Sequence, residues 1–564
     1  MPAKLKLAKL KFAAGGSGAA QPLEIDCPPV TILVGPNNAG KSLTLREIEA
    51  WVSGQDVQLR VLDTIVLETP STFAELMELL RPFRAERVED QETRLGHFWL
   101  TRPITRGSEQ RQMAQVREED LQHTFEQQSD LNKRGLLYRF LVTRLDGRTR
   151  FELVDPKPTG DLKKYPQNLL SALFQDASAR QRVREFTSEA FGSHYVIDPT
   201  GMRLFQVRMS TRAPTSVLEE QALDNASRQF HEAAIDIAEL GDGVKASVGL
   251  VSAVLGLPDS ILLLDEPEAF LHPTLARRLG RVLAEATRSR DASLVISTHS
   301  SEFLMGCIQA SPDIRIVRLT FERSQASARS IDAAEITALM NDPLLRSANA
   351  LRALFHRGVI VTEADADRAF YEEVNYRLSR VGRGVEDVLF LNAQNWQTIP
   401  RLLRPLRKLG VPAAGIIDID ALRDKDFKHL WPLLNVDAPT LTSLQTRRAE
   451  VKVLMDGVGK AACKSKGVAA LDAADKPKLR SLIDGFEKYG LFFVPTGELE
   501  CWLPVLMNGV GKSDKGEWLT TAFDRMGVDP SALGYVKPGP GDVWGFVEKV
   551  KKWIDNPNRL GILA

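Results

Sequence analysis

Cysteine is scarce in this sequence, and its positive and negative charges balance. The 564 residues include four cysteines, and no two of them form a C-x-x-C pair. This pattern argues against a zinc ribbon or a disulfide framework and fits a reducing compartment. The 73 basic and 73 acidic residues cancel to a formal net charge of zero. Bulk electrostatic capture of nucleic acid is therefore disfavoured, whereas a local basic groove is still allowed.

Long apolar runs and sustained heptads are absent as well. No stretch reaches the roughly 18 apolar residues of a membrane span, and the opening MPAKLKLAKLKF contains no apolar signal core. We therefore expect a soluble, cytoplasmic protein without membrane contact. The lack of heptads predicts no long coiled coil. A hydrophobic content of 43% is ordinary for a globular protein. The length predicts roughly two to four domains.

A glycine-rich loop between a predicted strand and a predicted helix indicates a nucleotide site. An apolar strand at 29–34 leads into GPNNAGKS, and a helical stretch at 43–51 follows. Glycine lets the backbone curl so that its N–H groups face a phosphate at the helix N-terminus. Lys41 would reach the β- and γ-phosphates of ATP, and Ser42 would ligate Mg²⁺. The predicted loop consists of Gly35, Pro36, Asn37, Asn38, Ala39, Gly40, Lys41 and Ser42.

A second stretch, SILLLDEPEAFLHP at 260–273, predicts the catalytic centre of the same site. Its apolar run at 261–264 suits a strand buried on both faces of a parallel sheet, and Asp265 would stand at the carboxyl end where such sheets bind ligands. We expect Asp265 to hold the magnesium shell and Glu266 to polarise the attacking water. His299, in STHS after the strand at 293–297, is expected to contact the γ-phosphate.

Acidic residues at three further strand ends predict a second site. Glu363 ends an apolar strand at 359–362, and Asp367 lies one helical turn further on. Asp418 and Asp420 project to one face at a period of two, and Glu498 follows the apolar strand at 491–494. Carboxylates gathered in this way repel one another unless a cation lies between them. Hard oxygen ligands suit Mg²⁺ or Mn²⁺, which activate water in phosphodiester cleavage.

The remaining segments set the expected domain organisation. We predict an α/β chain with one domain at 1–350, carrying a mixed α+β insertion at 52–230, and a parallel α/β domain at 351–564, carrying a helical insertion at 440–488. Within the first insertion, 136–142 with 150–154 and 194–197 with 204–209 are predicted hairpins. One helix collects basic residues near one face, and a solvated surface is favoured over a phosphate-tracking role for it. These are Arg401, Arg404, Arg407 and Lys408.

Together, GPNNAGKS, LGDGVKA at 240–246, LLLDEPEAFLHP and STHS resemble the ATP-binding-cassette (ABC) type ATPases of the SMC-like, RecF and OLD group. The resemblance implies that two heads sandwich ATP and that the signature loop of one subunit completes the site of the other. A homodimer or higher oligomer is therefore expected, with Gly241 and Gly243 at the phosphates. Gly241 replaces the usual signature serine, so activation of hydrolysis across the dimer could be weak.

The second half resembles a TOPRIM domain, in which a glutamate follows the first strand and D-x-D follows a later one. An ATPase followed by TOPRIM resembles the OLD-family (overcoming lysogenization defect) nucleases, including Gabija-type defence proteins. This implies an endonuclease, anti-phage defence and a second defence protein as a further partner. Ala364 stands where the family usually has glycine. Family members also use a late lysine near the scissile phosphate, for which Lys549, Lys551 and Lys552 are candidates.

Three functions remain open at this point. The first is an ATP-binding, metal-dependent endonuclease that cleaves DNA and is gated by the ATPase dimer. The second is a RecF-like or SMC-like repair ATPase whose second domain binds without cleaving. The third keeps the nuclease but directs it at RNA such as tRNA, as in PARIS-type systems. DNA is favoured over RNA as the nucleic-acid partner.

Overall fold

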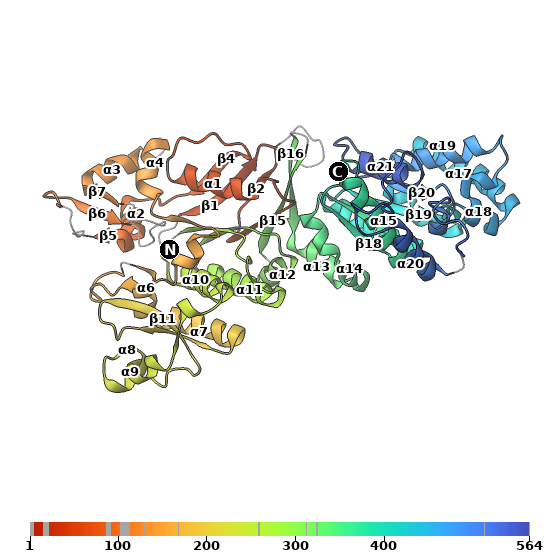
Figure 1. Cartoon of the computed structure of the whole chain (residues 1–564). Coiled ribbons are helices and arrows are strands. Elements are labelled where there is room, and N and C mark those ends of the chain that lie inside the picture. Colours follow the sequence, from red (N-terminus) through yellow and green to blue (C-terminus); the bar gives the residue numbers. More distant parts are fainter. Residues whose placement is uncertain are drawn as a thin grey trace.

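The protein was analysed as a computed structural model that describes most of the chain. The described residues are 5–14, 22–85, 92–101, 113–127, 131–166, 168–257, 260–290, 292–311, 313–322, 325–511 and 514–562. They form two α/β lobes side by side, each built on a sheet of mainly parallel strands (Figure 1). No described helix is long and apolar enough to cross a bilayer. The α/β class predicted from the sequence is confirmed.

A six-stranded sheet organises the first lobe. Its strand order is β16-β15-β3-β14-β13-β8, and all neighbours are parallel except β15 and β16. The strands are β3 (Val30–Val34), β8 (Val142–Leu145), β13 (Ile261–Asp265), β14 (Ser293–Ser297), β15 (Ile314–Glu322) and β16 (Gln325–Asp332). The predicted strands at 29–34, 261–264 and 293–297 are confirmed. Their near-continuous apolar sequences follow from burial on both faces of the sheet.

Helices cover both faces of this sheet, and alternate strand residues point to them. Leu263 and Val295 belong to the hydrophobic core on the side of α1 (Lys41–Val52). Leu262 and Ile296 belong to the core on the opposite side, where Figure 1 shows α10, α11 and α12. These helices span Asp242–Gly256, Pro273–Arg290 and Ser301–Ala310. The sheet therefore separates the helix after the phosphate loop from the helix that follows the signature loop.

The segment at 52–230 is only partly an insertion. The hairpin predicted from 136–142 and 150–154 is wrong, because these stretches lie in α4 (Leu131–Tyr138) and α5 (Thr149–Glu152). β8 lies between the two helices and pairs in parallel with β13, so it extends the central sheet. The Asp146-Gly147 turn leads from β8 into α5 instead of closing a hairpin. Burial of β8 against the sheet thus outweighs the local turn signal. Also, β4 (Leu62–Glu68) pairs with β1 (Lys6–Phe12).

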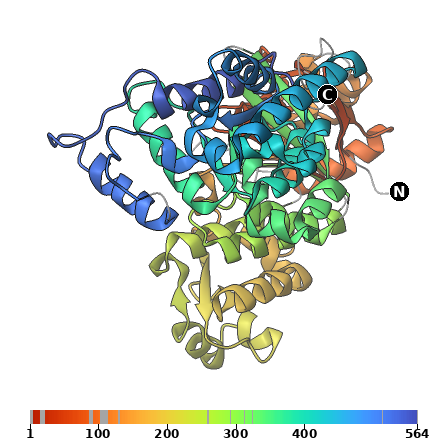
Figure 2. The same cartoon turned by 90° about the vertical axis from the view of Figure 1, so that its right-hand side faces the viewer.

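The rest of that segment forms two attachments. The hairpin predicted at 194–209 is confirmed as β10 (His194–Asp198) and β11 (Leu204–Ser210). With helices α6 to α9 it projects as an arm away from both sheets (Figure 1, Figure 2). Those helices span Leu169–Gln175, Ala177–Phe191, Val217–Gln221 and Asn225–Glu232. The second attachment is a small sheet of β5 (Arg84–Ala85), β6 (Phe98–Thr101) and β7 (Met113–Val116), with α2 (Phe73–Leu80) and α3 (Glu118–Glu126).

The second lobe contains a parallel sheet of order β18-β17-β19-β20. Its strands are β17 (Gly358–Thr362), β18 (Val388–Asn392), β19 (Ala413–Asp418) and β20 (Leu491–Val494). Residues of α15 (Asp365–Ser379) and α21 (Asp542–Ile554) share a core with one face, and residues of α16 (Ile399–Lys408) and α19 (Lys476–Glu487) with the other. The helical region predicted at 440–488 contains α17 (Ala438–Val458), α18 (Lys460–Lys466) and α19.

Arg318 of β15 joins the two lobes. Its side chain is buried and donates hydrogen bonds to the backbone oxygens of Leu354 (3.3 Å), His356 (2.9 Å) and Gly410 (3.0 Å). The connection runs through α13 (Ala333–Asn341), α14 (Pro343–Ser347) and a 3-10 helix at Ala350–Phe355. One hydrophobic cluster continues from the first sheet into the second. The domain boundary expected at residue 350 stays a prediction.

Close packing of α11 on α12 depends on Gly280 of α11 and Gly306 of α12, which gives a test of the fold. A Cβ on Gly306 would lie 1.9 Å from the Arg277 backbone oxygen. Gly306→Ala should therefore lower the free energy of unfolding by about 1–3 kcal/mol through overpacking. Gly545 in α21 has nothing within 4 Å of such a Cβ. Gly545→Ala should raise stability by about 0.5–1 kcal/mol. Chemical denaturation measures both, and equal effects would contradict the helix packing.

Candidate functional site

The phosphate loop lies between β3 and α1, as predicted. Gly35 has φ 141° and Gly40 φ 93°, and the helix begins at Lys41. A Cβ on Gly35 would lie 2.1 Å from the Leu319 backbone oxygen of β15, so only glycine fits there. The first turn of α1 has backbone N–H groups without helical partners, and a phosphate is the natural acceptor for them. The loop can therefore bind an anionic phosphate group.

Lys41 lies over its own loop. Its Nζ donates hydrogen bonds to the backbone oxygens of Gly35 (2.9 Å) and Pro36 (2.8 Å). Burial lowers the pKa of Lys41 to about 8, although the charges of Glu266 and Asp265 oppose this shift. Because these carboxylates hold the ammonium charge in place, the lysine is positioned to neutralise a phosphate.

Asp265 is the meeting point of three elements. Its Oδ1 accepts a hydrogen bond from Ser42 Oγ of α1 (2.8 Å) and another from Ser297 Oγ of β14 (2.5 Å). The parallel register places Asp265 directly opposite Ser297. A carboxylate beside a serine hydroxyl offers the hard oxygen ligands that Mg²⁺ prefers. Ser42 and Asp265 could therefore hold the magnesium ion of a bound nucleotide, as the sequence predicts.

Glu266 and His299 face each other at the same edge. Glu266 has φ 49°, a left-handed conformation, and its N–H donates to Ser297 O (3.0 Å). Its Oε1 lies 3.3 Å from His299 Nε2. The hydrogen bond from His299 lowers the pKa of Glu266, against the effect of burial. About half of the Glu266 side chain is exposed. An ionised, half-exposed carboxylate at this position can polarise a water molecule.

Two further residues, not predicted from the sequence, hold this centre. Arg150 of α5 is buried and donates to the backbone oxygens of Asp265 (2.9 Å) and Glu266 (2.9 Å). Glu268 Oε1 accepts from Thr298 Oγ1 (2.7 Å) and from the His299 N–H (2.8 Å). The last acid of the DEPE motif is a sequence signal for Glu268. Arg150 has no local signal, because it comes from a stretch predicted to be a hairpin strand.

The signature loop lies apart from the phosphate loop. Gly241 caps the N-terminus of α10, and a Cβ on Gly243 would lie 2.9 Å from the Phe270 backbone oxygen in the loop after β13. Among the described residues, no hydrogen bond or ion pair links Gly241 or Gly243 to the phosphate loop. Within the described part of the chain, neither glycine is therefore hydrogen-bonded to its own phosphate loop.

Three of the predicted acids gather at the carboxyl end of the second sheet. Glu363 Oε1 accepts from the Asp418 N–H (2.6 Å), and Asp367 Oδ2 accepts from the Ala364 N–H (3.1 Å). Burial, followed by the charges of Asp367 and Asp420, raises the pKa of Glu363 to about 7. Burial and the charge of Glu363 raise the pKa of Asp418 well above its usual range. These carboxylates crowd one another, which is the electrostatic setting for a divalent cation.

Lysines occupy part of this acidic cluster. Lys515, the first residue of α20 (Lys515–Met526), places its Nζ 3.5 Å from Asp367 Oδ1. Lys460 Nζ lies 3.6 Å from Asp420 Oδ2, and Lys464 Nζ lies 3.0 Å from Glu498 Oε2. The charge of Lys515 also acts on Asp418 and Glu363 and lowers the pKa of both carboxyl groups, against the effect of burial. Lys515 is thus a lysine near the end of the chain that lies beside the acidic cluster.

Two of the late lysines proposed from the sequence lie elsewhere. Lys549 pairs with Glu487 (2.9 Å) and Lys551 pairs with Asp555 (2.8 Å). Both lie on α21, and their partner acids are not those of the predicted metal set. Lys515 was missed because a lysine at a helix start carries no motif.

The predicted metal ligands do not form a ready-made shell. Among the residues that the structure describes, no group of three or more His, Cys, Asp or Glu side chains could hold a metal ion. The oxygen donors suit Mg²⁺ or Mn²⁺ chemically. However, Asp420 and Glu498 form ion pairs with lysines. The full predicted set is Glu363, Asp367, Asp418, Asp420 and Glu498.

The prediction that Arg407 belongs to an exposed basic face of α16 is wrong. This side chain is buried, and its guanidinium donates to backbone oxygens of Ala413, Leu433 and Tyr489 among others. It therefore fastens α16 inside the lobe. Arg401 and Lys408 are exposed but pair with Asp342 (2.9 Å) and Glu335 (2.6 Å).

A phosphate loop, an acidic strand end and a histidine at one edge of a parallel sheet define a P-loop ATPase site. Comparison with known families agrees: residues 213–305 match the family described as "AAA domain, putative AbiEii toxin, Type IV TA system". The match includes the signature loop, the acidic strand and STHS. The phosphate loop lies before it in the chain. An ATPase of this kind binds nucleotide, usually with Mg²⁺.

Solved structures similar to this chain include three SMC head domains. One is bound to the C-winged helix domain of ScpA; it has a TM-score of 0.34 and 12% identity, covering 59% of this chain and 99% of that one. The head from Thermotoga maritima has a TM-score of 0.28 and 17% identity, covering 58% and 99%. A head domain with an extended coiled coil, bound to the C-terminal domain of ScpA derived from Pyrococcus furiosus, has a TM-score of 0.32 and 12% identity. This match covers 60% of this chain and 99% of that one. Among curated proteins no sequence matches.

The crowded acids predict a dependence of stability on pH. The ordinary pKa of Glu363 is 4.5, and in the folded protein it is about 7. Because a raised pKa means that folding binds protons, this stabilisation is present below about pH 4.5 and is lost as the pH rises through about 7. Without divalent metal, wild type should lose more unfolding free energy than Glu363→Gln between about pH 5.5 and pH 8.

Urea denaturation in EDTA at the two pH values measures this difference. Glu239→Gln, at an exposed carboxylate outside the cluster, is the matched control and should behave as wild type. Equal pH dependence in wild type and Glu363→Gln would contradict the crowding of the acids.

Proposed function

We propose that this protein is an ATP-binding, metal-dependent endonuclease in which an ABC-type ATPase dimer controls phosphodiester hydrolysis at the second acidic cluster. The observation that carries the proposal is the burial of Glu363, Asp367 and Asp418 together at the end of a second parallel sheet. Acids buried together in one place are costly to fold, and such clusters are typical of functional sites. DNA is the proposed substrate.

In the ATPase domain each polar residue has a proposed role. Lys41 and the loop amides bind the phosphates, and Ser42 and Asp265 hold Mg²⁺. Glu266 accepts a proton from the attacking water, and His299 orients Glu266 and meets the γ-phosphate. Gly241 and Gly243 make no hydrogen bond to their own phosphate loop among the described residues, and we propose that they complete the site of a second copy. The proposed active unit is therefore a homodimer.

In the second domain a bound Mg²⁺ or Mn²⁺ would supply an activated water and stabilise the leaving oxygen. We propose that Glu363 and Asp418 carry the cation, with Asp367, Asp420 and Glu498 completing the oxygen set. Lys515, held 3.5 Å from Asp367, is placed to neutralise the scissile phosphate. The resemblance to TOPRIM domains of OLD-family nucleases supports this assignment and the expected role in anti-phage defence.

One observation favours a second function. The described acids include no group of three that could hold a metal ion, and lysines lie against Asp367, Asp420 and Glu498. An acidic cluster neutralised by lysines could be a non-cleaving module. The protein would then be a RecF-like or SMC-like repair ATPase, which hydrolyses ATP without cutting nucleic acid.

A cleavage assay separates these functions. Full-length protein is incubated with supercoiled plasmid or structured RNA, with Mg²⁺ or Mn²⁺, in the presence and absence of ATP. Wild type should cleave DNA, and Asp418→Asn with Asp420→Asn should lower the rate by more than about a hundredfold, because loss of outer-shell contacts alone costs up to that factor. Asp484→Asn, at an exposed acid of α19, should cleave as wild type.

The outcomes are distinct. Cleavage of RNA but not plasmid would move the proposal to an RNA nuclease. Active ATP hydrolysis with intact nucleic acid under all conditions would favour the repair ATPase and contradict the nuclease.

A further inference from the structure

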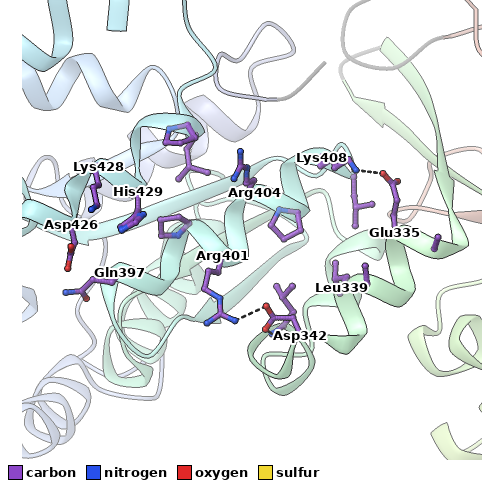
Figure 3. A pocket seen from close by; sticks show the side chains of 18 residues that line it. Glu335, Leu339, Asp342, Gln397, Arg401, Arg404, Lys408, Asp426, Lys428 and His429 are labelled. Carbon is purple, nitrogen blue, oxygen red and sulfur yellow. Dashed lines mark hydrogen bonds and ion pairs between the residues drawn. The ribbon is translucent and has the colours of Figure 1, made fainter. Parts of the chain in front are cut away.

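A cavity of about 900 Å³ lies between the two lobes, away from both sites described above. Figure 3 shows side chains of α13 and α14 on one side and of α16 on the other. Two short 3-10 helices, Lys425–His429 and Trp431–Leu433, contribute Lys428, His429 and Pro432. No residue of the phosphate loop and none of the acids Glu363, Asp367 or Asp418 lines it. It is therefore a separate candidate site.

Ion pairs hold the two sides of the cavity together. Arg401 of α16 pairs with Asp342, the residue between α13 and α14, at 2.9 Å. Lys408 at the other end of α16 pairs with Glu335 of α13 at 2.6 Å. Both pairs are visible in Figure 3. Because both acids on the first-lobe side are already paired, they do not neutralise the remaining cations of the cavity.

Three of those remaining side chains can carry positive charge. For Arg404, Lys428 and His429, no hydrogen bond or ion pair of the side chain occurs among the described residues. Asp426 is the one acid of the lining that is not in an ion pair among those residues. The cavity thus has an excess of cationic groups, which favours an anionic ligand.

The rest of the lining is mainly apolar. It includes Leu339, Leu345, Pro400, Pro405, Leu409 and Leu433. A concave, mostly apolar wall with a few polar groups, in the range of roughly 300–1,000 Å³, is typical of sites for small organic ligands. The ligand should therefore combine an apolar part with an anionic group.

We propose that this cavity binds a nucleoside phosphate, with its base against the leucines and prolines and its phosphate at Arg404 and Lys428. Arginine and lysine are the side chains that recognise phosphate by charge-assisted hydrogen bonds. A ligand in this position contacts both lobes, so its binding stabilises their arrangement. The site does not depend on the proposed nuclease, and its ligand is a free nucleotide instead of the nucleotide at the phosphate loop.

Calorimetric titration of full-length protein with AMP tests the proposal. The protein carries Lys41→Ala, and AMP lacks the β- and γ-phosphates that the phosphate loop holds, so binding there is suppressed. AMP should bind, and adenosine should bind about tenfold more weakly or less. Arg404→Ala and Lys428→Ala should each weaken AMP binding about tenfold, the factor for one charge-assisted contact. Lys425→Ala, an exposed neighbour outside the lining, is the matched control.

Arg404 and Lys428 are exposed, so these variants should keep the thermal stability of the Lys41→Ala protein. Failure of AMP to bind, or equal binding by Arg404→Ala, Lys428→Ala and Lys425→Ala, would overturn the proposal. A single-stranded oligonucleotide that binds where AMP does not, and loses affinity in the same two variants, would also overturn it. The nuclease proposal is untouched by any of these results, because cleavage is assayed separately.

Discussion

The carboxylate of Asp265 is the constraint on which the first lobe depends. It accepts hydrogen bonds from Ser42 at the start of α1 and from Ser297 at the end of β14. Strands β13 and β14 must therefore end at one level beside the start of α1, and the paired register of the two strands provides this. Arg150 fixes the backbone beneath this carboxylate from the opposite side. A polar group placed so firmly at a sheet edge needs little reorganisation to receive a charged ligand.

The two acidic sites differ in how their carboxylates are stabilised. Asp265 is satisfied by hydroxyl donors, whereas Glu363 and Asp418 raise each other's pKa in a buried place. The sites are connected through β15. Gly35 of the phosphate loop packs against Leu319, and the adjacent Arg318 holds His356 and Gly410 of the second lobe. Neighbouring residues of one strand thus contact the phosphate loop and the second lobe. The cavity beside α16 lies next to the same joint.

Much of this arrangement could be predicted from the sequence, because its motifs are local. The loop at Gly35–Ser42 and the strand ending at Asp265 have short-range signatures of glycine, apolar residues and acids. The strands of the second sheet are short, continuous apolar runs, and this local pattern is enough to predict them. Arg150, Arg407 and Lys515 could not be predicted, since their roles arise from contacts distant in sequence. The false hairpin around Asp146 shows how pairing in the sheet overrides a turn signal.

The measurement that tests the account most directly is ATP turnover by Glu266→Gln beside wild type and Lys41→Ala. The central claim is that Glu266, held by His299 at 3.3 Å, accepts the proton of the attacking water. Loss of a general base lowers the rate by about 10²–10⁴-fold. Glu266→Gln should therefore bind ATP and hydrolyse it at least about a hundredfold more slowly, whereas Lys41→Ala should lose binding. Turnover by Glu266→Gln at the wild-type rate would contradict the account.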